Sequence, residues 1–204
     1  MFYIDTKDIP PLEGSTVVIT PKQAIIQYID DSTATLTEYD IPLMYCDKSE
    51  TKEIAFVIDE FILDCCKKYR GLGIDSKSLY FEDVITYDYE EGDIMEWTTN
   101  TSKLYGCFIV SQEVIELLEE DIVIKLSIEN NFLKLDDDCG KVLKNKMCLN
   151  FENFTISPQT FNSTYLTEAI KDHYGQFCKI FMGDEQPLCL EFNNKRVFIA
   201  PIIN

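Results

Sequence analysis

Few residues of this chain could form a nucleophile and its base. The chain has one histidine, His173, and the cysteine closest to it in sequence is Cys178. A thiolate nucleophile needs an adjacent base that a third group orients, and no motif around this pair supplies one. The sequence also contains no Gly-rich phosphate loop and no G-x-S-x-G motif. We therefore expect a protein that is not an enzyme and has no cofactor.

Acidic and cysteine side chains are the candidates for metal binding. The acidic run at residues 136–138 lacks the spaced ligands and the closing glutamate of a calcium loop, so we interpret it as a solvated turn. A zinc site needs clustered ligands, and the eight cysteines form no C-x-x-C pair. No metal site is predicted. Most cysteines have apolar or aromatic neighbours, which is typical of small buried side chains in a reducing compartment.

The charge of the chain limits how it could bind nucleic acid. It has 18 Lys and Arg against 36 Asp and Glu, a net charge of −18. Phosphate contacts need clustered basic residues, and an acidic exterior repels DNA at long range. A DNA-related function therefore depends on where the few basic residues lie. No stretch approaches the roughly 20 apolar residues that span a bilayer, and no secretory signal is present, so we expect an intracellular protein without a membrane partner.

The elements that would position these residues are short strands and three short helices. A helical period predicts helices over residues 59–69, 112–120 and 162–172, with Asp59 and Ser111 as caps of the first two. Strand patterns cover residues 15–20, 23–28, 33–40, 53–58, 78–81, 84–89, 104–110, 122–128, 132–135, 146–154, 177–182, 188–192 and 197–202. This order predicts an α+β fold with antiparallel sheets and short helices on one face. It divides into an N-terminal half (residues 1–89), a polar connector (90–103) and a similar C-terminal half (104–204).

Two segments resemble the family of DNA sliding clamps that includes proliferating cell nuclear antigen. Residues 24–37 read Ala-Ile-Ile-Gln-Tyr-Ile-Asp-Asp-Ser-Thr-Ala-Thr-Leu-Thr, close to an early strand motif with an apolar pair, Gln and Met-Asp-Ser-Ser-His-Val. Residues 187–192 read Pro-Leu-Cys-Leu-Glu-Phe, and residues 197–202 read Val-Phe-Ile-Ala-Pro-Ile, which resembles the family's C-terminal strand. The chain departs from the family at its start. Pro10 and Pro11 prevent a regular helix there, so we expect the first helix to be reduced or missing.

The resemblance implies a ring that encircles double-stranded DNA, with helices lining the hole. Lys67, Lys68 and Arg70 near the end of the first predicted helix, and Lys171 on the third, are the implied sequence-independent DNA contacts. The alternative is that the lysines complement a helix C-terminus and stay solvated. The middle helix carries only acidic charges, Glu113, Glu116, Glu119 and Glu120. It therefore disfavours DNA unless ring partners supply basic charge.

The resemblance also implies a pocket beneath the connector that captures a short peptide motif of partner proteins. Apolar side chains and prolines suit such a preformed groove. The alternative assigns the same positions to ordinary core and strand ends. The implied pocket residues are Ile29, Thr33, Ala34, Leu36, Pro187, Phe198, Ala200 and Pro201.

The resulting expectation is a sliding-clamp subunit, a processivity factor and recruitment platform in replication and repair. Its implied partners are double-stranded DNA, other clamp subunits in a homo- or heterotrimeric ring, DNA polymerase, and proteins with clamp-interacting motifs. Its implied location is the nucleus, or the site of DNA replication for a viral protein. Two alternatives stay open: a subunit of a heterotrimeric DNA-damage checkpoint clamp, and a clamp-fold scaffold without a DNA role, such as a viral transcription or decoy factor. The shortened first helix and the acidic middle helix favour the checkpoint clamp.

Overall fold

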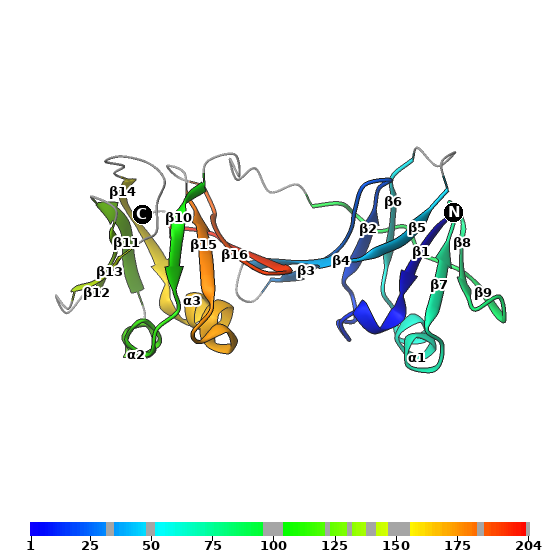
Figure 1. Cartoon of the computed structure of the whole chain (residues 1–204), viewed down its shortest axis with the longest axis horizontal. Helices are drawn as coiled ribbons and strands as arrows, with labels where there is room; N and C mark the ends of the chain where they lie inside the picture. Colours follow the sequence, from blue (N-terminus) through cyan, green and yellow to red (C-terminus); the bar gives the residue numbers. More distant parts are fainter. Residues whose placement is uncertain are drawn as a thin grey trace. The chain divides into compact units, whose positions relative to one another are not determined.

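The computed structural model describes residues 1–31, 35–47, 52–95, 104–120, 123–129, 132–137, 142–146, 156–182 and 186–202 (Figure 1). Contacts divide the chain into two compact units. Unit 1 comprises residues 1–29 and 37–96, and unit 2 comprises residues 30–36 and 97–204. The predicted division at residues 1–89, 90–103 and 104–204 stays a prediction, and residues 96–103 of the connector lie outside the described part of the chain.

The elements repeat one order, a strand, a helix and three strands. The first repeat contains β1 (Phe2–Asp5), the 3-10 helix η1 (Thr6–Asp8), β2 (Thr16–Ile19), β3 (Ala24–Asp30) and β4 (Thr35–Ile41), and is followed by β5 (Leu43–Cys46). The second contains β6 (Ile54–Val57), α1 (Glu60–Lys68), β7 (Gly71–Ile74), β8 (Ser78–Phe81) and β9 (Ile85–Asp88). The three-residue η1 stands where the other repeats have an α-helix, so the prediction of a reduced first helix is confirmed.

The C-terminal half has the same order twice more. The third repeat contains β10 (Leu104–Ile109), α2 (Gln112–Glu120), β11 (Val123–Glu129), β12 (Phe132–Asp137) and β13 (Val142–Lys146). The fourth contains β14 (Ile156–Asn162), α3 (Ser163–Ile170) with the 3-10 helix η2 (Lys171–His173), β15 (Phe177–Phe181), β16 (Leu188–Phe192) and β17 (Lys195–Ile199). The predicted α+β class with two similar halves is confirmed.

Strand pairing joins the repeats of each unit. In unit 1, β1 pairs with β7 and β6 pairs with β2. In unit 2, β10 pairs with β15 and β14 pairs with β11, and all four pairings are antiparallel. The opening strand of each repeat therefore lies beside the strand that follows the helix of its companion repeat. In the described chain, β9 ends the sheet β5-β1-β7-β8-β9, and β13 ends the sheet β13-β12-β11-β14.

Each unit has its own core, and the helices contribute their apolar sides to it. In unit 1, α1 buries Ile62 and Cys65 against strand residues such as Phe56 and Phe81. In unit 2, α2 and α3 pack on each other and on the sheets. Among the described residues, no helix is long and apolar enough to cross a membrane.

Several strands were missed by sequence pattern. Helix α1 ends at Lys68, and Gly71 and Gly73 lie in β7. A Cβ on Gly73 would lie 3.1 Å from Cε1 of Tyr3, so a larger residue there would require the Tyr3 ring to shift by a few tenths of an ångström. The missed strands are β1, β5, β7, β13 and β14. The strand expected over residues 146–154 lies outside the described residues, apart from Lys146, which ends β13.

Candidate functional site

The start of the predicted connector is built into unit 1 as an extra strand segment. Glu91 forms an antiparallel bridge with Phe56 of β6. The Val57 N–H donates to the Glu90 carbonyl at 3.1 Å, and the Gly92 N–H donates to the Ala55 carbonyl at 3.1 Å. The connector therefore begins as a continuation of the sheet at the β6 edge.

The side chain of Gln27 holds the next part of the connector. Its Nε2 donates to the Met95 carbonyl oxygen at 2.9 Å and to Glu38 Oε1 at 2.9 Å. Its Oε1 accepts from the Met95 N–H at 3.0 Å. Gln27 and Glu38 are 4% and 8% exposed, so these polar groups are satisfied inside the protein. Neither Gln27 nor Glu38 was predicted as a site residue, although a glutamine inside the apolar run of β3 was a visible signal.

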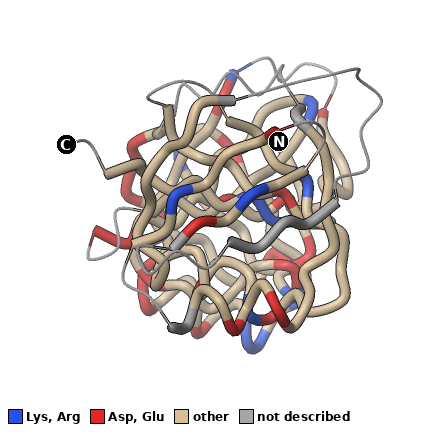
Figure 2. The backbone as a smooth tube through the Cα atoms, turned by 90° about the vertical axis from the view of Figure 1, so that its left-hand side faces the viewer, with Lys and Arg blue, Asp and Glu red and all other residues tan. Residues whose placement is uncertain are grey.

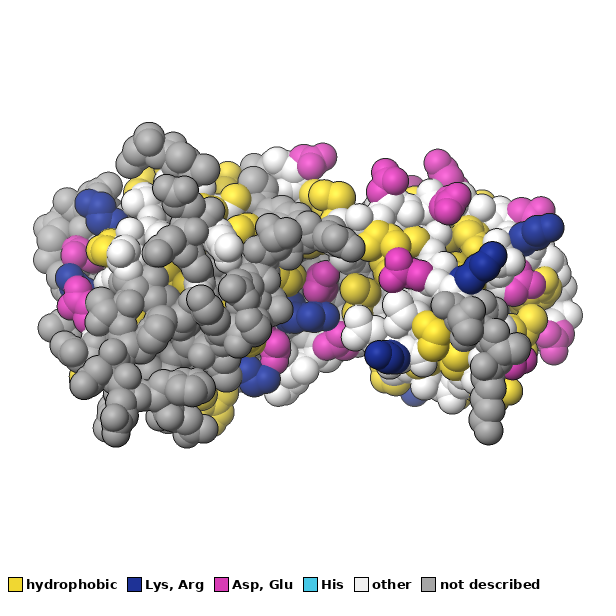
Figure 3. Space-filling model, turned by 90° about the horizontal axis from the view of Figure 1, so that it is seen from above, with side chains coloured by type: hydrophobic (Ala, Val, Ile, Leu, Met, Phe, Trp, Pro, Cys, Tyr) yellow, Lys and Arg dark blue, Asp and Glu magenta, His cyan; other side chains and the backbone are white. Residues whose placement is uncertain are grey.

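Apolar side chains are exposed at the same place. Ile29 and Ile94 are each 39% exposed and Met95 is 37% exposed. Ile29 follows Gln27 by two residues in β3, so the two side chains share a face of the strand. Hydrophobic side chains lie among acidic ones on the surface of unit 1, at the right of Figure 3. Ile29, which the resemblance assigned to the peptide pocket, thus lies on the face that carries the connector.

The other predicted pocket residues belong to unit 2. Leu36 and Phe198 are packed in one buried cluster with Phe181 and Cys189, and are 0% and 4% exposed. The structure therefore brings these two predicted residues together, but as buried side chains. Pro187, Ala200 and Pro201 are half-buried, whereas Thr33 and Ala34 lie outside the described residues.

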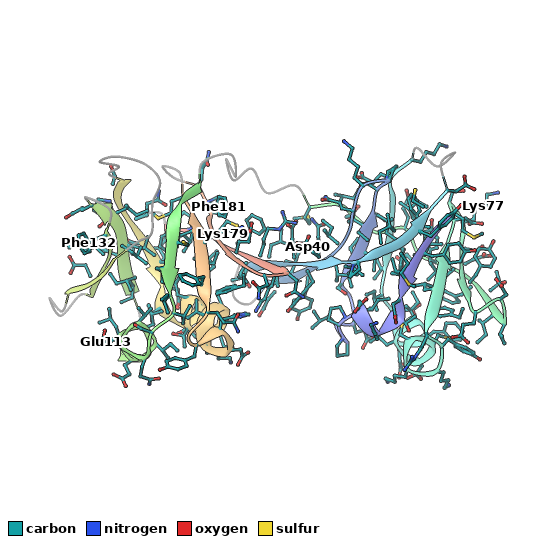
Figure 4. The ribbon with its side chains drawn as sticks, viewed as in Figure 1. Asp40, Lys77, Glu113, Phe132, Lys179 and Phe181 are labelled. Carbon is teal, nitrogen blue, oxygen red and sulfur yellow. The ribbon has the colours of Figure 1, made fainter. Side chains whose placement is uncertain are left out.

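One ion pair joins β15 and β16 beside this buried cluster. Lys179 and Glu191 are cross-strand partners and form an ion pair. Lys179 and Phe181 lie two residues apart on β15 (Figure 4), so this ion pair lies next to the buried apolar cluster.

The predicted DNA contacts lie at helix ends in both units. In unit 1, Lys67 and Lys68 end α1 and are exposed, and Arg70 is exposed just beyond it. The Lys67 Nζ donates to Asp64 at 2.9 Å, which raises the pKa of this lysine. In unit 2, Lys171 follows α3 and forms an ion pair with Glu168, which also raises its pKa. Each of these two lysines therefore has a carboxylate three residues before it.

Helix α2 presents acidic side chains. Glu113, labelled in Figure 4, and Glu116 are exposed, and Gln112 Nε2 donates to Glu116 Oε1 at 3.1 Å. The side chains of Glu119 and Glu120 lie outside the described residues. Figure 2 marks basic and acidic positions on the described backbone, and over the full sequence the 36 acidic residues outnumber the 18 basic ones. The helix therefore offers no attraction for phosphates.

Metal and thiol chemistry have little support in the described part of the chain. It contains no group of three or more potential metal ligands. Its six cysteines are free thiols, of which Cys65, Cys178 and Cys189 are buried. Burial raises the pKa of the Cys66 thiol to about 12, which keeps it protonated and unreactive at neutral pH.

Comparison with known proteins identifies the architecture. No protein-family model and no curated protein matches the sequence. The PCNA2–PCNA3 complex from Sulfolobus tokodaii matches the chain with a TM-score of 0.57 at 16% identity, over 98% of both chains. The structure of the C-terminal region of FEN-1 bound to A. fulgidus PCNA matches with a TM-score of 0.59 at 17% identity, over 100% of this chain and 99% of that chain.

This chain has the sliding-clamp fold. The match covers both units, so the clamp fold accounts for all four repeats and not for one half alone. The resemblance predicted from two short segments is thereby confirmed at the level of the fold.

Proposed function

We propose that this chain is a subunit of a DNA sliding clamp. It closes a ring around double-stranded DNA and holds DNA polymerase and other replication or repair proteins there. The observation that carries the proposal is the likeness to clamp structures over 98–100% of the chain. The subunit performs no chemistry of its own and needs no cofactor, because tethering works by raising the effective concentration of the partner. Its place of action is the nucleus, or the site of viral DNA replication.

Two sheet edges suit ring closure between copies of this chain. An unpaired edge strand is an aggregation hazard unless it is covered, and β9 and β13 both end their sheets in the described chain. Exposed acidic residues, Asp88 and Glu90 among them, accompany β9, whereas the sequence of β13 contains Lys144 and Lys146. Head-to-tail pairing of β9 with β13 of the next copy would join opposite charges in a heterologous interface that closes by rotation.

The few basic residues supply loose contacts to the duplex. Lys67, Lys68, Arg70 and Lys171 are exposed on the helical side of their units. Contacts of this kind bind phosphate without sequence preference, as sliding requires. The partner proteins dock a short motif at the connector, where Ile29, Ile94 and Met95 expose apolar surface.

A mixed ring is the second candidate. Helix α2 exposes Glu113 and Glu116 and contains no basic residue. These carboxylates favour a heterotrimeric checkpoint clamp in which the other subunits supply the basic charge toward DNA. The same helix suits a clamp-fold scaffold without a DNA role, which is the third candidate.

Light scattering and negative-stain electron microscopy test the proposal at micromolar protein concentration. A uniform clamp gives a mass about three times the 23.6 kDa of one chain and rings with a central hole. A monomer that forms rings only with other subunits supports the mixed clamp. A compact oligomer without a hole overturns the clamp function and leaves the scaffold. The same conclusion follows if the protein stays bound to circular plasmid DNA no longer than to linear DNA, from which a ring can slide off.

A further inference from the structure

Gln27 is a buried polar residue that the sheet itself does not require. It lies in β3 beside the buried Ile25 and Ile26, and only 4% of it is exposed. A buried amide costs stability unless its donors and acceptor find partners. Gln27 finds them on Glu38 in β4 and on Met95, which is 68 residues away in sequence. Its hydrogen bonds therefore serve a long-range contact.

The contact to Met95 fixes the connector backbone in two ways. The Gln27 amide accepts from the Met95 N–H at 3.0 Å and donates to the Met95 carbonyl at 2.9 Å. Both polar backbone groups of one residue are engaged, as they would be by a neighbouring strand. This pairing sets the position and the rotation of the backbone at Met95, and hence the direction of its side chain.

Glu38 sets the orientation of the amide. A carboxylate only accepts hydrogen bonds, so the Nε2 side of Gln27 must face Glu38 Oε1, 2.9 Å away. The Gln27 oxygen is then directed to the Met95 N–H. Both amide hydrogens and the oxygen of Gln27 are used, which leaves one arrangement in which every group is satisfied.

A second anchor lies upstream at Gly92. Its N–H donates to Ala55 at 3.1 Å, and a Cβ there would lie 2.6 Å from Cγ2 of Thr16. The backbone thus lies against β2 at Gly92 and against the Gln27 side chain at Met95. Only Asp93 and Ile94 stand between the two anchors, so the segment has little freedom.

We propose that Gln27 is a positioning residue for partner binding. With Glu38 it holds the connector so that Ile94 and Met95 stay exposed as preorganised docking surface beside Ile29. The inference rests on the proposed capture of partner peptides. A surface that is already ordered loses less conformational entropy when the partner binds, so the affinity is higher.

Three variants test the role of Gln27 in the full-length protein. Gln27→Met keeps the volume but removes all three hydrogen bonds, and Gln27→Glu places a carboxylate opposite Glu38. The swap of Gln27→Glu with Glu38→Gln restores a donor–acceptor pair and an acceptor for the Met95 N–H, but no donor for the Met95 carbonyl. Gln23→Leu, at an exposed turn position, is the matched control.

Amide hydrogen exchange at Met95 and the affinity for a fluorescent peptide are measured on each variant. The peptide is the C-terminal region of FEN-1, the segment that is bound to A. fulgidus PCNA in the similar structure. We expect Gln27→Met and Gln27→Glu to speed Met95 exchange about tenfold and to weaken peptide binding roughly 5- to 30-fold, the size of a lost buried hydrogen-bond network. The swap should lie between these variants and the wild type. Amides in the core, such as that of Phe56, should keep their exchange rates in every variant and so report an intact fold.

The outcomes separate the two proposals. Unchanged Met95 exchange in Gln27→Met and Gln27→Glu overturns the anchoring role. Faster exchange with unchanged peptide affinity overturns the positioning role. A wild-type protein that fails to bind the peptide counts against the proposed partner capture, whereas the exchange rates still decide whether Gln27 holds the connector. If Gln27→Met does not fold, Glu38→Gln provides the milder change, and it should speed Met95 exchange without unfolding the unit.

Discussion

The Tyr87 hydroxyl donates a hydrogen bond to Asp59, the residue that caps helix α1. The other carboxylate oxygen of Asp59 accepts from the Ile62 N–H at 2.8 Å. The Tyr87 ring stacks on Phe61 of the same helix at a centroid distance of 4.6 Å. One carboxylate therefore joins the edge strand β9 to the start of α1. The strand proposed to close the ring and the helix proposed to face DNA are linked through it.

Tyr87→Phe should lower the free energy of unfolding by about 0.5–1.5 kcal/mol, because it removes one part-buried hydrogen bond but keeps the ring stack. Urea denaturation followed by circular dichroism measures this. Tyr174→Phe is the control, since Tyr174 is 63% exposed and its change should leave stability within about 0.5 kcal/mol of the wild type. Equal decreases in the free energy of unfolding in both variants would show that the Tyr87 hydrogen bond does not stabilise the fold.

Stability should also depend on alkaline pH through Tyr87. The hydrogen bond to Asp59 raises the pKa of Tyr87, with burial acting in the same direction. A raised pKa favours the protonated form in the folded state, so its stabilisation is complete below the ordinary tyrosine value of about 10 and is lost at higher pH. Between about pH 9 and 11.5, the unfolding free energy of the wild type should therefore fall more than that of Tyr87→Phe. Other tyrosines, such as Tyr80, titrate in both proteins, so parallel curves would contradict this role.

The helices were predictable because their signals are local. Asp59 caps α1 as expected, and the apolar side of each helix follows its own spacing. Strand β14 was missed because Pro158 and its polar neighbours interrupt the apolar pattern. In the structure β14 is an edge strand, and its register with β11 shifts opposite this segment, between Leu126 and Ile128. Proline is tolerated at such a place, but sequence pattern does not reveal the edge.

The candidate site was only partly predictable because it depends on contacts distant in sequence. Ile29 was assigned by resemblance, and the structure places it on the same strand face as Gln27. The pairing of Gln27 with Met95 links residues 68 positions apart, which no local periodicity can indicate. Likewise, the core position of Leu36 with Phe198 comes from tertiary packing, and an apolar residue in a strand looks the same whether it lines a groove or a core.

Replacing Lys67 and Lys68 by glutamate should weaken binding to duplex DNA about tenfold or more at low salt, because two phosphate contacts become repulsive. Lys22→Glu, at an exposed turn, is the charge control and should change affinity much less. Fluorescence anisotropy over a series of salt concentrations measures both affinity and salt dependence. The slope of log affinity against log salt should decrease by about one for each lost contact. A decrease in affinity no larger than that of the control would show that these lysines do not contact DNA.

Gly92→Ala should displace the connector, since its Cβ would lie 2.6 Å from Thr16 Cγ2 and 3.1 Å from the Phe56 carbonyl carbon. We expect faster amide exchange at position 92 and at Met95 in this variant, with a loss of about 1–3 kcal/mol in unfolding free energy. Gly14→Ala is an informative contrast, because a Cβ there meets nothing within 4 Å and only its φ of +78° is strained. It should cost stability without changing exchange at Met95. Slow exchange at Met95 in Gly92→Ala would mean that the segment relaxes without leaving its anchor.

Charge reversal at the two sheet edges should test ring closure by identical copies. If β9 of one copy lies beside β13 of the next, Lys144→Glu with Lys146→Glu opposes acidic residues across the interface and should shift trimers toward monomers in light scattering. Asp88→Lys with Glu90→Lys should do the same from the other edge. An equimolar mixture of the two double variants forms complementary β9–β13 pairs, but a three-membered ring that mixes them keeps one interface between like charges. In a chain with all four substitutions, a basic β9 faces an acidic β13 at every interface. A chain with all four substitutions should therefore assemble again, whereas Lys22→Glu should leave the wild-type mass unchanged.

The shift of the double variants from trimers toward monomers should be smaller at about 1 M salt, where the screening length is about 3 Å. Assembly unaffected by either pair of reversals would place the subunit interface elsewhere.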